Sequence, residues 1–209
     1  MCGRFSLTQT AEVIIEHFSL KQGLYMKPRY NVAPGESIPI IRTLGVVDFL
    51  QWGFKPSWME ETKAGTGFIN VRAETVQIRP AFRDALKKRR CLIILDGYYE
   101  WKTIGRLKQP YYIRRKEGAV FAAAGIWEND SCGILTTVAN SLLSPIHPRM
   151  PLILEKETYQ KWLDAKSPIK EIIEIVLTPP SSLPFLSYPV TPKVNNPRFE
   201  GLECIQSLQ

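Results

Sequence analysis

The chain of 209 residues is poor in metal-binding side chains, with only four cysteines and two histidines. The cysteines lie far apart and form no C-x-x-C pair, so we expect no zinc site, no other cofactor and no disulfide. The sequence also lacks an apolar run long enough to cross a bilayer, and its start, MCGRFSLTQT, has no signal-peptide pattern. We therefore expect a soluble cytoplasmic protein with no membrane partner.

Acidic residues are fewer than basic ones, since 20 Asp and Glu stand against 27 Lys and Arg for a net charge of +7. A positive surface gains free energy by releasing the counterions of a polyanion, so this charge favours nucleic acid as a partner. Charge alone does not identify the partner, because many basic proteins bind no nucleic acid.

Internal repeats are absent, and 16 prolines predict many rigid turns and few long helices. The first expected helix follows a cap at Thr8 and carries apolar residues at positions 11, 14, 15 and 18 on one face. His17 lies opposite to that face and is expected to be exposed. Further helices are expected after Pro80 and over residues 156–163 and 168–175.

Runs of β-forming residues predict strands at 37–42, 46–52, 91–95, 98–102, 111–114, 120–126, 134–138 and 151–154. The fold class that fits these elements is α+β. We expect a single domain, monomeric, with a mainly antiparallel, curved β-sheet or barrel and short flanking helices. The Pro-rich segment from about 178 to 209 is expected to be irregular and ordered by packing of Phe185, Tyr188 and Val190.

Cys2 follows the initiator methionine. Aminopeptidases remove Met1 before a small residue, so the mature chain is expected to begin with a 1,2-aminothiol, whose amine has an ordinary pKa of about 8. The amine can form a Schiff base with an aldehyde, such as the opened sugar of an abasic site, and the thiol can then close a stable thiazolidine ring. From Cys-Gly alone, an accidental cysteine or a glutamine amidotransferase with an N-terminal nucleophile explains this residue as well.

Seven motifs narrow the choice: MCGRF, RYNVAPGESIPI at 29–40, WGFKPSW at 52–58, INVRAET at 69–75, RRCLIILDGYYEWK at 89–102, AAAGIWE at 122–128 and HPRMPLIL at 147–154. In this order, and with VNNPRFEG at 194–201, they resemble the SOS-response-associated peptidase-like family over nearly the whole chain. The resemblance implies a protein that shields abasic sites by a covalent bond to Cys2, with lyase-type chemistry, reversal of the crosslink and autopeptidase activity on Met1.

The resemblance also implies the catalytic residues. Asn70 matches the family's asparagine, whose amide can accept from the Cys2 amine and donate to a sugar oxygen. Glu100 matches its glutamate, and a carboxyl enclosed by aromatic residues should have a raised pKa suited to proton transfer. Strand alternation points Glu100 away from Tyr99 and Trp101, so a solvated glutamate is the alternative. His147 matches the family's histidine and can protonate the sugar ring oxygen or bind a phosphate.

A single strand of DNA is bound through phosphate contacts and through side chains that stack on bases. The expected phosphate ligands are arginines close to the motif residues: Arg4, Arg29, Arg72 and Arg149. The expected stacking residues are Trp52, Trp58, Trp101, Pro34 and Pro56, with core packing an equal alternative for each tryptophan. The expected partner is single-stranded DNA with an abasic site, including single-strand to duplex junctions, which would bring the protein to the nucleoid.

Three other classes of function stay open. A cysteine-type peptidase would use the same thiol on a peptide. A glutamine amidotransferase would need an oxyanion hole and pockets for the ends of glutamine, and no further motif supplies them. A non-catalytic single-strand binder would not require Cys2.

Overall fold

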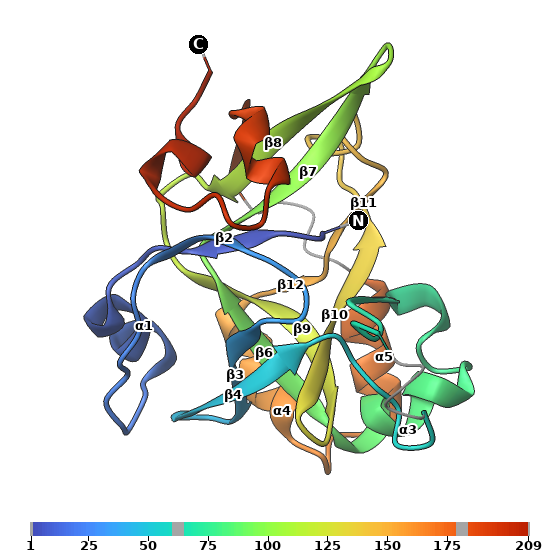
Figure 1. Ribbon diagram of the computed structural model, residues 1–209. Coiled ribbons are helices and arrows are strands. Elements are labelled where there is room, and N and C mark those ends of the chain that lie inside the picture. Colours follow the sequence, from blue (N-terminus) through green and yellow to red (C-terminus); the bar gives the residue numbers. More distant parts are fainter. Residues whose placement is uncertain (1, 60–64, 179–183, 209) are drawn as a thin grey trace.

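The computed structural model describes residues 2–59, 65–178 and 184–208 and contains two β-sheets (Figure 1). The larger sheet consists of β3 (Ser37–Thr43), β4 (Val46–Trp52), β5 (Asn70–Arg72), β6 (Arg90–Leu95), β9 (Phe121–Glu128), β10 (Ser131–Val138), β11 (Arg149–Pro151) and β12 (Ile153–Leu154). The smaller sheet consists of β1 (Phe5–Leu7), β2 (Arg29–Val32), β7 (Gly97–Ile104), β8 (Leu107–Arg115) and β13 (Phe185–Pro189). The helices are α1 (Ala11–Phe18), α3 (Pro80–Lys88), α4 (Tyr159–Leu163) and α5 (Ile169–Leu177). The expected α+β class is confirmed.

Strand β10 closes the larger sheet on itself. It pairs with β9 in antiparallel fashion and with β4 in parallel fashion at Ser131 and Cys132. The ring β4, β3, β6, β9 and β10 therefore returns to its start, as the predicted curved sheet or barrel requires. Outside this ring, β10 also pairs in parallel with β5 and in antiparallel fashion with β11. Strands β4, β5 and β11, which are far apart in sequence, thus all pair with β10.

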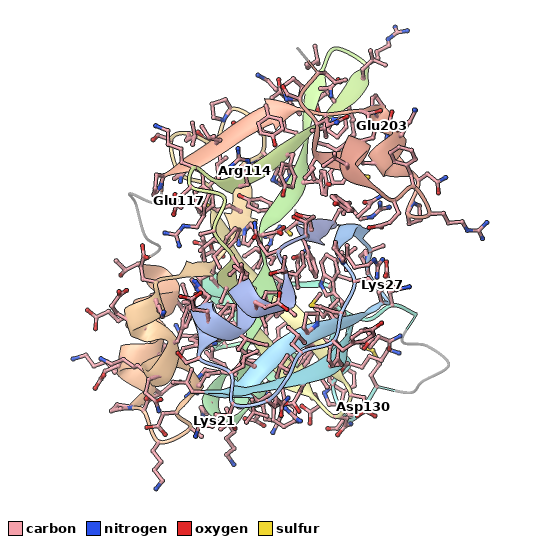
Figure 2. All side chains as sticks on the ribbon, turned by 90° about the vertical axis from the view of Figure 1, so that its left-hand side faces the viewer. Lys21, Lys27, Arg114, Glu117, Asp130 and Glu203 are labelled. Atoms are coloured by element: carbon pink, nitrogen blue, oxygen red, sulfur yellow. The ribbon has the colours of Figure 1, made fainter. Side chains whose placement is uncertain are left out.

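Strand β6 is buried on both faces, as its continuous apolar sequence predicts. Leu92 and Ile94 face a core shared with the four helices, whereas Cys91, Ile93 and Leu95 face a second core that contacts the smaller sheet. Figure 2 views the molecule from the side of α1, with Arg114 of β8 in its upper part and Lys21 near the bottom. A third, smaller apolar cluster joins the outer face of the smaller sheet to the C-terminal segment.

The N-terminal strand β1 is fixed by the buried carboxylate of Asp96. This carboxylate accepts hydrogen bonds from the Ser6 hydroxyl (2.6 Å), the Thr8 hydroxyl (2.7 Å) and the Gln9 N–H (3.0 Å), and also from the Thr8 N–H. A buried carboxylate needs such donors to offset its loss of hydration. The same interaction sets the direction in which the chain enters the core at Cys2.

Gly97 lets a tyrosine close this network. A Cβ at position 97 would lie 2.2 Å from the Tyr112 hydroxyl. That hydroxyl is 2.8 Å from the Ser6 hydroxyl. Only a residue without a side chain therefore allows Tyr112 to approach β1.

All four expected helices are confirmed, but two details of the first are wrong. Thr10 caps α1, not Thr8, because the Thr10 side chain accepts from the Val13 N–H. His17 is half-buried with its ring 4.6 Å from that of Phe18, so the expected exposure is wrong. The described helices include none long and apolar enough to span a bilayer.

The expectation of an irregular C-terminal segment is wrong over Phe185–Pro189. These residues form β13, which pairs with β8 along its whole length. Phe185 and Val190 are buried, as expected. After the strand the chain continues in two 3-10 turns, Pro192–Asn195 and Leu202–Ile205, that cover the outer face of the smaller sheet.

Candidate functional site

Strand β7 places Glu100 inside the protein. Alternation along the strand puts Tyr99 and Trp101 into the cluster under the C-terminal segment, and puts Tyr98 into the core cluster that contains Cys2. Glu100 follows Tyr98 on that inner side, and its side chain is only 3% exposed. Burial raises the pKa of Glu100 to about 7. The alternative of a solvated glutamate is therefore excluded.

Cys2 is fully buried, and its thiol lies 3.9 Å from the Arg4 carbonyl oxygen. Burial raises the pKa of this thiol well above its ordinary value, and the nearby Glu100 charge raises it further. The thiol is consequently protonated at neutral pH. A sulfur nucleophile at this position needs a base that removes its proton.

Asn70 contacts the N-terminal residue directly, because its side-chain N–H donates to the Cys2 carbonyl at 2.7 Å. Asn70 starts β5, whose pairing with β10 fixes its position opposite Ile134. The indole N–H of Trp52 donates to the Ile69 carbonyl at 2.9 Å and fixes the preceding residue. The Asn70 amide oxygen is buried and accepts no hydrogen bond in the described part of the chain.

His147 lies at the end of the loop that leads into β11. Its Nδ1 is 3.9 Å from the Glu100 carboxylate and accepts from the Arg149 N–H at 3.0 Å. Burial lowers the pKa of His147, and the positive charges of Arg149 and Lys108 lower it further. The imidazole is therefore mainly neutral at neutral pH.

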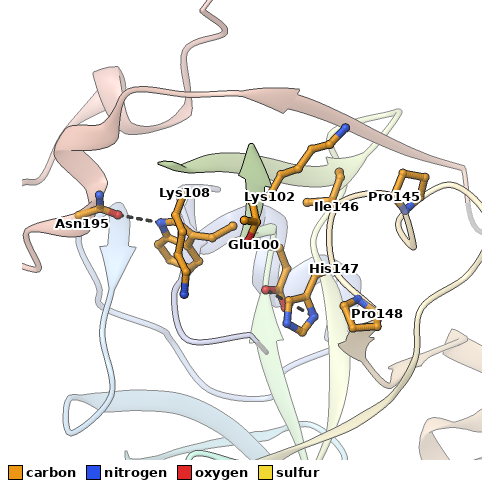
Figure 3. Close-up of a pocket in the computed structure, with 10 residues that line it drawn as sticks. Glu100, Lys102, Lys108, Pro145, Ile146, His147, Pro148 and Asn195 are labelled. Carbon is orange, nitrogen blue, oxygen red and sulfur yellow. Dashed lines mark hydrogen bonds and ion pairs between the residues drawn. The ribbon is translucent and has the colours of Figure 1, made fainter. Parts of the chain in front are cut away.

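An open cleft of about 760 Å³ contains Glu100 and His147 (Figure 3). Its walls come from β7, β8, the loop before β11 and the C-terminal segment. They are formed by Glu100, Trp101, Lys102, Thr103, Lys108, Pro145, Ile146, His147, Pro148 and Asn195. This volume is within the range of small-molecule sites, and the cleft contains the ion-pair partners Glu100 and His147.

The tryptophans that were expected to stack on bases lie in different environments. Trp52 has no exposed surface and packs against Phe5 with ring centroids 5.1 Å apart, so its stacking role is wrong and it is a core residue. Trp101 is partly exposed and lines the cleft. Trp58 is 67% exposed. Pro34 is partly exposed on the loop that follows β2.

Arg4 binds the protein's own chain. Its guanidinium donates to the Asn31 side chain (2.9 Å) and to the carbonyls of Val194 (2.7 Å) and Asn195 (3.3 Å). The Asn195 side chain accepts from the Trp101 indole at 2.7 Å and lines the cleft. Sequence reasoning missed Asn31 and Asn195, although both lie in the quoted motifs, because they meet only through Arg4, which joins the two ends of the chain.

Two of the other arginines are paired with acids. Arg29 lies 2.5 Å from the Glu36 carboxylate. Arg149 donates to both carboxylate oxygens of Glu74, at 2.6 and 3.0 Å. Arg72, in contrast, is exposed. The role of these arginines as phosphate ligands stays a prediction, and Arg72 requires the least rearrangement.

Comparison with known proteins agrees with the motifs. A family model described as SOS response associated peptidase (SRAP) matches residues 1–197. The abasic site processing protein YoqW of Bacillus subtilis (strain 168) is 37% identical over 99% of this chain and 100% of its own. YedK of Escherichia coli (strain K12), which has the same description, is 31% identical over 99% of both chains. A crystal structure of a protein from Bacteroides thetaiotaomicron covers both chains completely, with a TM-score of 0.88 and 26% identity.

Proposed function

This chain belongs to the SOS response associated peptidase family, and from that premise we propose that it processes abasic sites in single-stranded DNA by forming a thiazolidine crosslink at Cys2. The observation that carries the proposal is the convergence of four side chains from distant parts of the sequence. Asn70 holds the Cys2 carbonyl, while Glu100 and His147 lie 3.9 Å apart at the cleft. Its relatives YoqW and YedK are described as abasic site processing proteins.

The reaction begins when hydrolysis of the Met1–Cys2 bond frees the Cys2 amine. The amine attacks the aldehyde carbon of the opened sugar, and loss of water gives an imine. The thiol sulfur then bonds to the imine carbon, and the nitrogen gains a proton. The product is a five-membered ring that keeps the lesion bound to the protein.

Glu100 is suited to move the protons of this reaction. The Cys2 thiol is protonated at neutral pH, so ring closure requires a nearby acceptor. A carboxyl group with a pKa of about 7 is partly ionised at that pH and can both take and return a proton. By microscopic reversibility, the same group serves ring opening and release of the DNA.

Asn70 and His147 have separate roles in the proposal. Asn70 orients Cys2 through the Cys2 carbonyl. The Asn70 amide oxygen accepts no hydrogen bond from the described residues and can accept one from the freed amine. His147 is mainly neutral and lines the cleft, and this position supports a role in opening the sugar ring. In this proposal His147 assists formation of the aldehyde, and Asn70 positions the amine that captures it.

A glutamine amidotransferase has less support. Such an enzyme needs an oxyanion hole and pockets for the two ends of glutamine, and no motif beyond Cys-Gly supplies them. A peptidase activity limited to Met1 is compatible with the proposal, because it supplies the free amine.

Intact-mass analysis tests the proposed function. After incubation with an oligonucleotide that carries one abasic site, we expect a one-to-one adduct that survives denaturation without borohydride, because a thiazolidine needs no reduction to persist. Cys2→Ala should abolish this adduct. The matched control is Cys204→Ser, which alters another buried cysteine and should form the adduct normally. A stable adduct of full yield from Cys2→Ala would overturn the mechanism.

A further inference from the structure

Strands β7 and β8 extend beyond the rest of their sheet as a two-stranded ribbon (Figure 1). Within the described residues, β1 pairs with β7 only at 97–98, and β13 pairs with β8 only at 111–115. The ribbon nevertheless stays paired as far as Ile104 and Leu107. Its turn has Gly105 at the first central position with φ of +59°, which is the residue that a tight two-residue hairpin turn favours.

The end of this ribbon, residues 102–108, has an unusual surface. It carries three basic residues, and no acidic residue occurs from 101 to 116. At the tip, Ile104 and Leu107 are 52% and 75% exposed. Because they pair directly across the two strands, their side chains share one face. A cationic ribbon with an apolar tip matches a ligand that presents both phosphates and flat apolar rings.

The ribbon is continuous with the cleft. Lys102 and Lys108 line the cleft beside Glu100 (Figure 3). Positions 100, 102 and 104 lie on one face of β7, and at a rise of about 3.3 Å per residue the tip lies about 13 Å beyond Glu100. That distance is about four nucleotides of stacked DNA, or fewer of an extended strand. DNA that leaves the cleft on this side must pass along the ribbon.

We propose that the ribbon tip, Ile104, Arg106 and Leu107, binds the DNA that flanks the lesion on one side. Arg106 contacts a phosphate, and the Ile104–Leu107 pair packs against the face of a base. This inference rests on the proposed function and deepens it, because it adds a flank-binding surface outside the cleft. The absence of acidic residues and the continuity with the cleft favour DNA over a protein partner as the occupant.

Crosslinking rates on oligonucleotides of different length test this inference. The shortest has one nucleotide on each side of the abasic site and cannot reach the tip. The others add six thymidines on the 5′ side or on the 3′ side. For the wild type we expect one of the two extensions to raise the rate. For the triple variant Ile104→Thr, Arg106→Gln, Leu107→Thr we expect that gain to fall by about fivefold or more, as loss of one stacking and one phosphate contact predicts.

The substitutions are chosen to keep the ribbon folded, since threonine is a strong strand former. The matched control is Val13→Thr with Lys21→Gln, which removes exposed apolar surface and one charge outside the ribbon, in α1 and just after it. Lys21 lies far from the ribbon in Figure 2. The control should keep the wild-type gain from the longer flank. Circular dichroism and thermal melting check that both variants are folded.

The outcomes separate this inference from the proposed function. If the wild type forms adducts but neither extension raises the rate, or if the triple variant keeps the gain, the ribbon inference is wrong and the proposed function stands. If the wild type forms no adduct, the proposed function fails. Equilibrium binding of the same lengths of undamaged DNA then decides the ribbon's role, and an unchanged Kd for the triple variant overturns it.

Discussion

The pKa of Glu100 is determined by how deeply its carboxyl group is buried, which the residue type alone does not predict. Its position between two aromatic residues predicts a strand, and strand alternation predicts the face on which it lies. Neither predicts that the loop at 145–148 would lie against that face. The raised pKa was anticipated from aromatic neighbours, yet Tyr99 and Trp101 point to the other side. Its cause is burial by residues that are distant in sequence.

Replacing Glu100 by glutamine should change how stability depends on pH. The folded-state pKa of about 7 lies above the ordinary value of 4.5, so the folded protein binds the extra proton. This contribution is complete below about pH 4.5 and is lost as the pH rises through 7. Relative to the wild type, Glu100→Gln should therefore gain up to roughly 3 kcal/mol of unfolding free energy between pH 5 and pH 8. Urea unfolding at both pH values measures this, and an unchanged difference would contradict the raised pKa.

The same variant should separate formation of the crosslink from its reversal. Because Glu100 moves protons in both directions, Glu100→Gln should slow release of the adduct more than it lowers the final yield. His147→Ala should instead slow the approach to the crosslink, since it acts when the sugar opens, and should also impair reversal. Formation is measured with excess protein, and reversal by transfer to a competing abasic oligonucleotide, across about pH 5.5–8.5. Wild-type rates for Glu100→Gln throughout that range would make Glu100 a structural residue only.

At the level of elements, long apolar strands and helices were predictable and short strands were not. The strand at 91–95 was anticipated because an unbroken apolar run needs burial on both faces. Strands β1, β2, β5 and β13 span three to five residues and were missed. A segment of three residues such as Asn70–Arg72 carries no periodic signal, and its strand conformation comes from pairing with β10. The candidate site depends on these short strands, so motif resemblance predicted its residues but not their arrangement.

Strand β1 illustrates such an element, and its anchor can be tested. Asp96 accepts from the side chains of Ser6 and Thr8 and from the backbone at Gln9, all near Cys2. Asp96→Ala leaves these buried donors without an acceptor and should cost about 2–4 kcal/mol of unfolding free energy. It should also slow crosslinking, because Cys2 is no longer held in register. Urea unfolding and the adduct assay measure the two effects.

The control for Asp96 is Asp48→Ala. Asp48 pairs with Arg42 on the surface at 2.8 Å, so its loss should cost less than about 1 kcal/mol and leave the crosslinking rate unchanged. Equal destabilisation by the two variants would show that Asp96 does not anchor β1. If Asp96→Ala is destabilised yet crosslinks at the wild-type rate, β1 is held near Asn70 by other contacts.

For the whole molecule, the distribution of charge matters more than the net charge of +7. Arg29 and Arg149 are paired with acids, and Arg4 is bound to the protein's own carbonyls. Four other basic residues are candidates for phosphate contacts: Lys102 and Lys108, which line the cleft, Arg106 at the ribbon tip, and the exposed Arg72 of β5. If all four contact phosphates of a single strand, the logarithm of the binding constant should fall with the logarithm of salt concentration with a slope of about −3.

The enclosed position of Cys2 also predicts a preference for DNA structure. The thiol has no exposed surface, and the cleft beside Glu100 is bounded by the ribbon on one side and the 145–148 loop on another. A sugar inside a continuous duplex keeps stacked neighbours and an opposing strand that would collide with these walls. A lesion in a single strand, or at a junction with duplex, should therefore crosslink at least about tenfold faster than the same lesion inside a duplex. Initial rates on the three substrates at one salt concentration measure this, and equal rates on single strand and duplex would show that the lesion reaches Cys2 by a route other than this cleft.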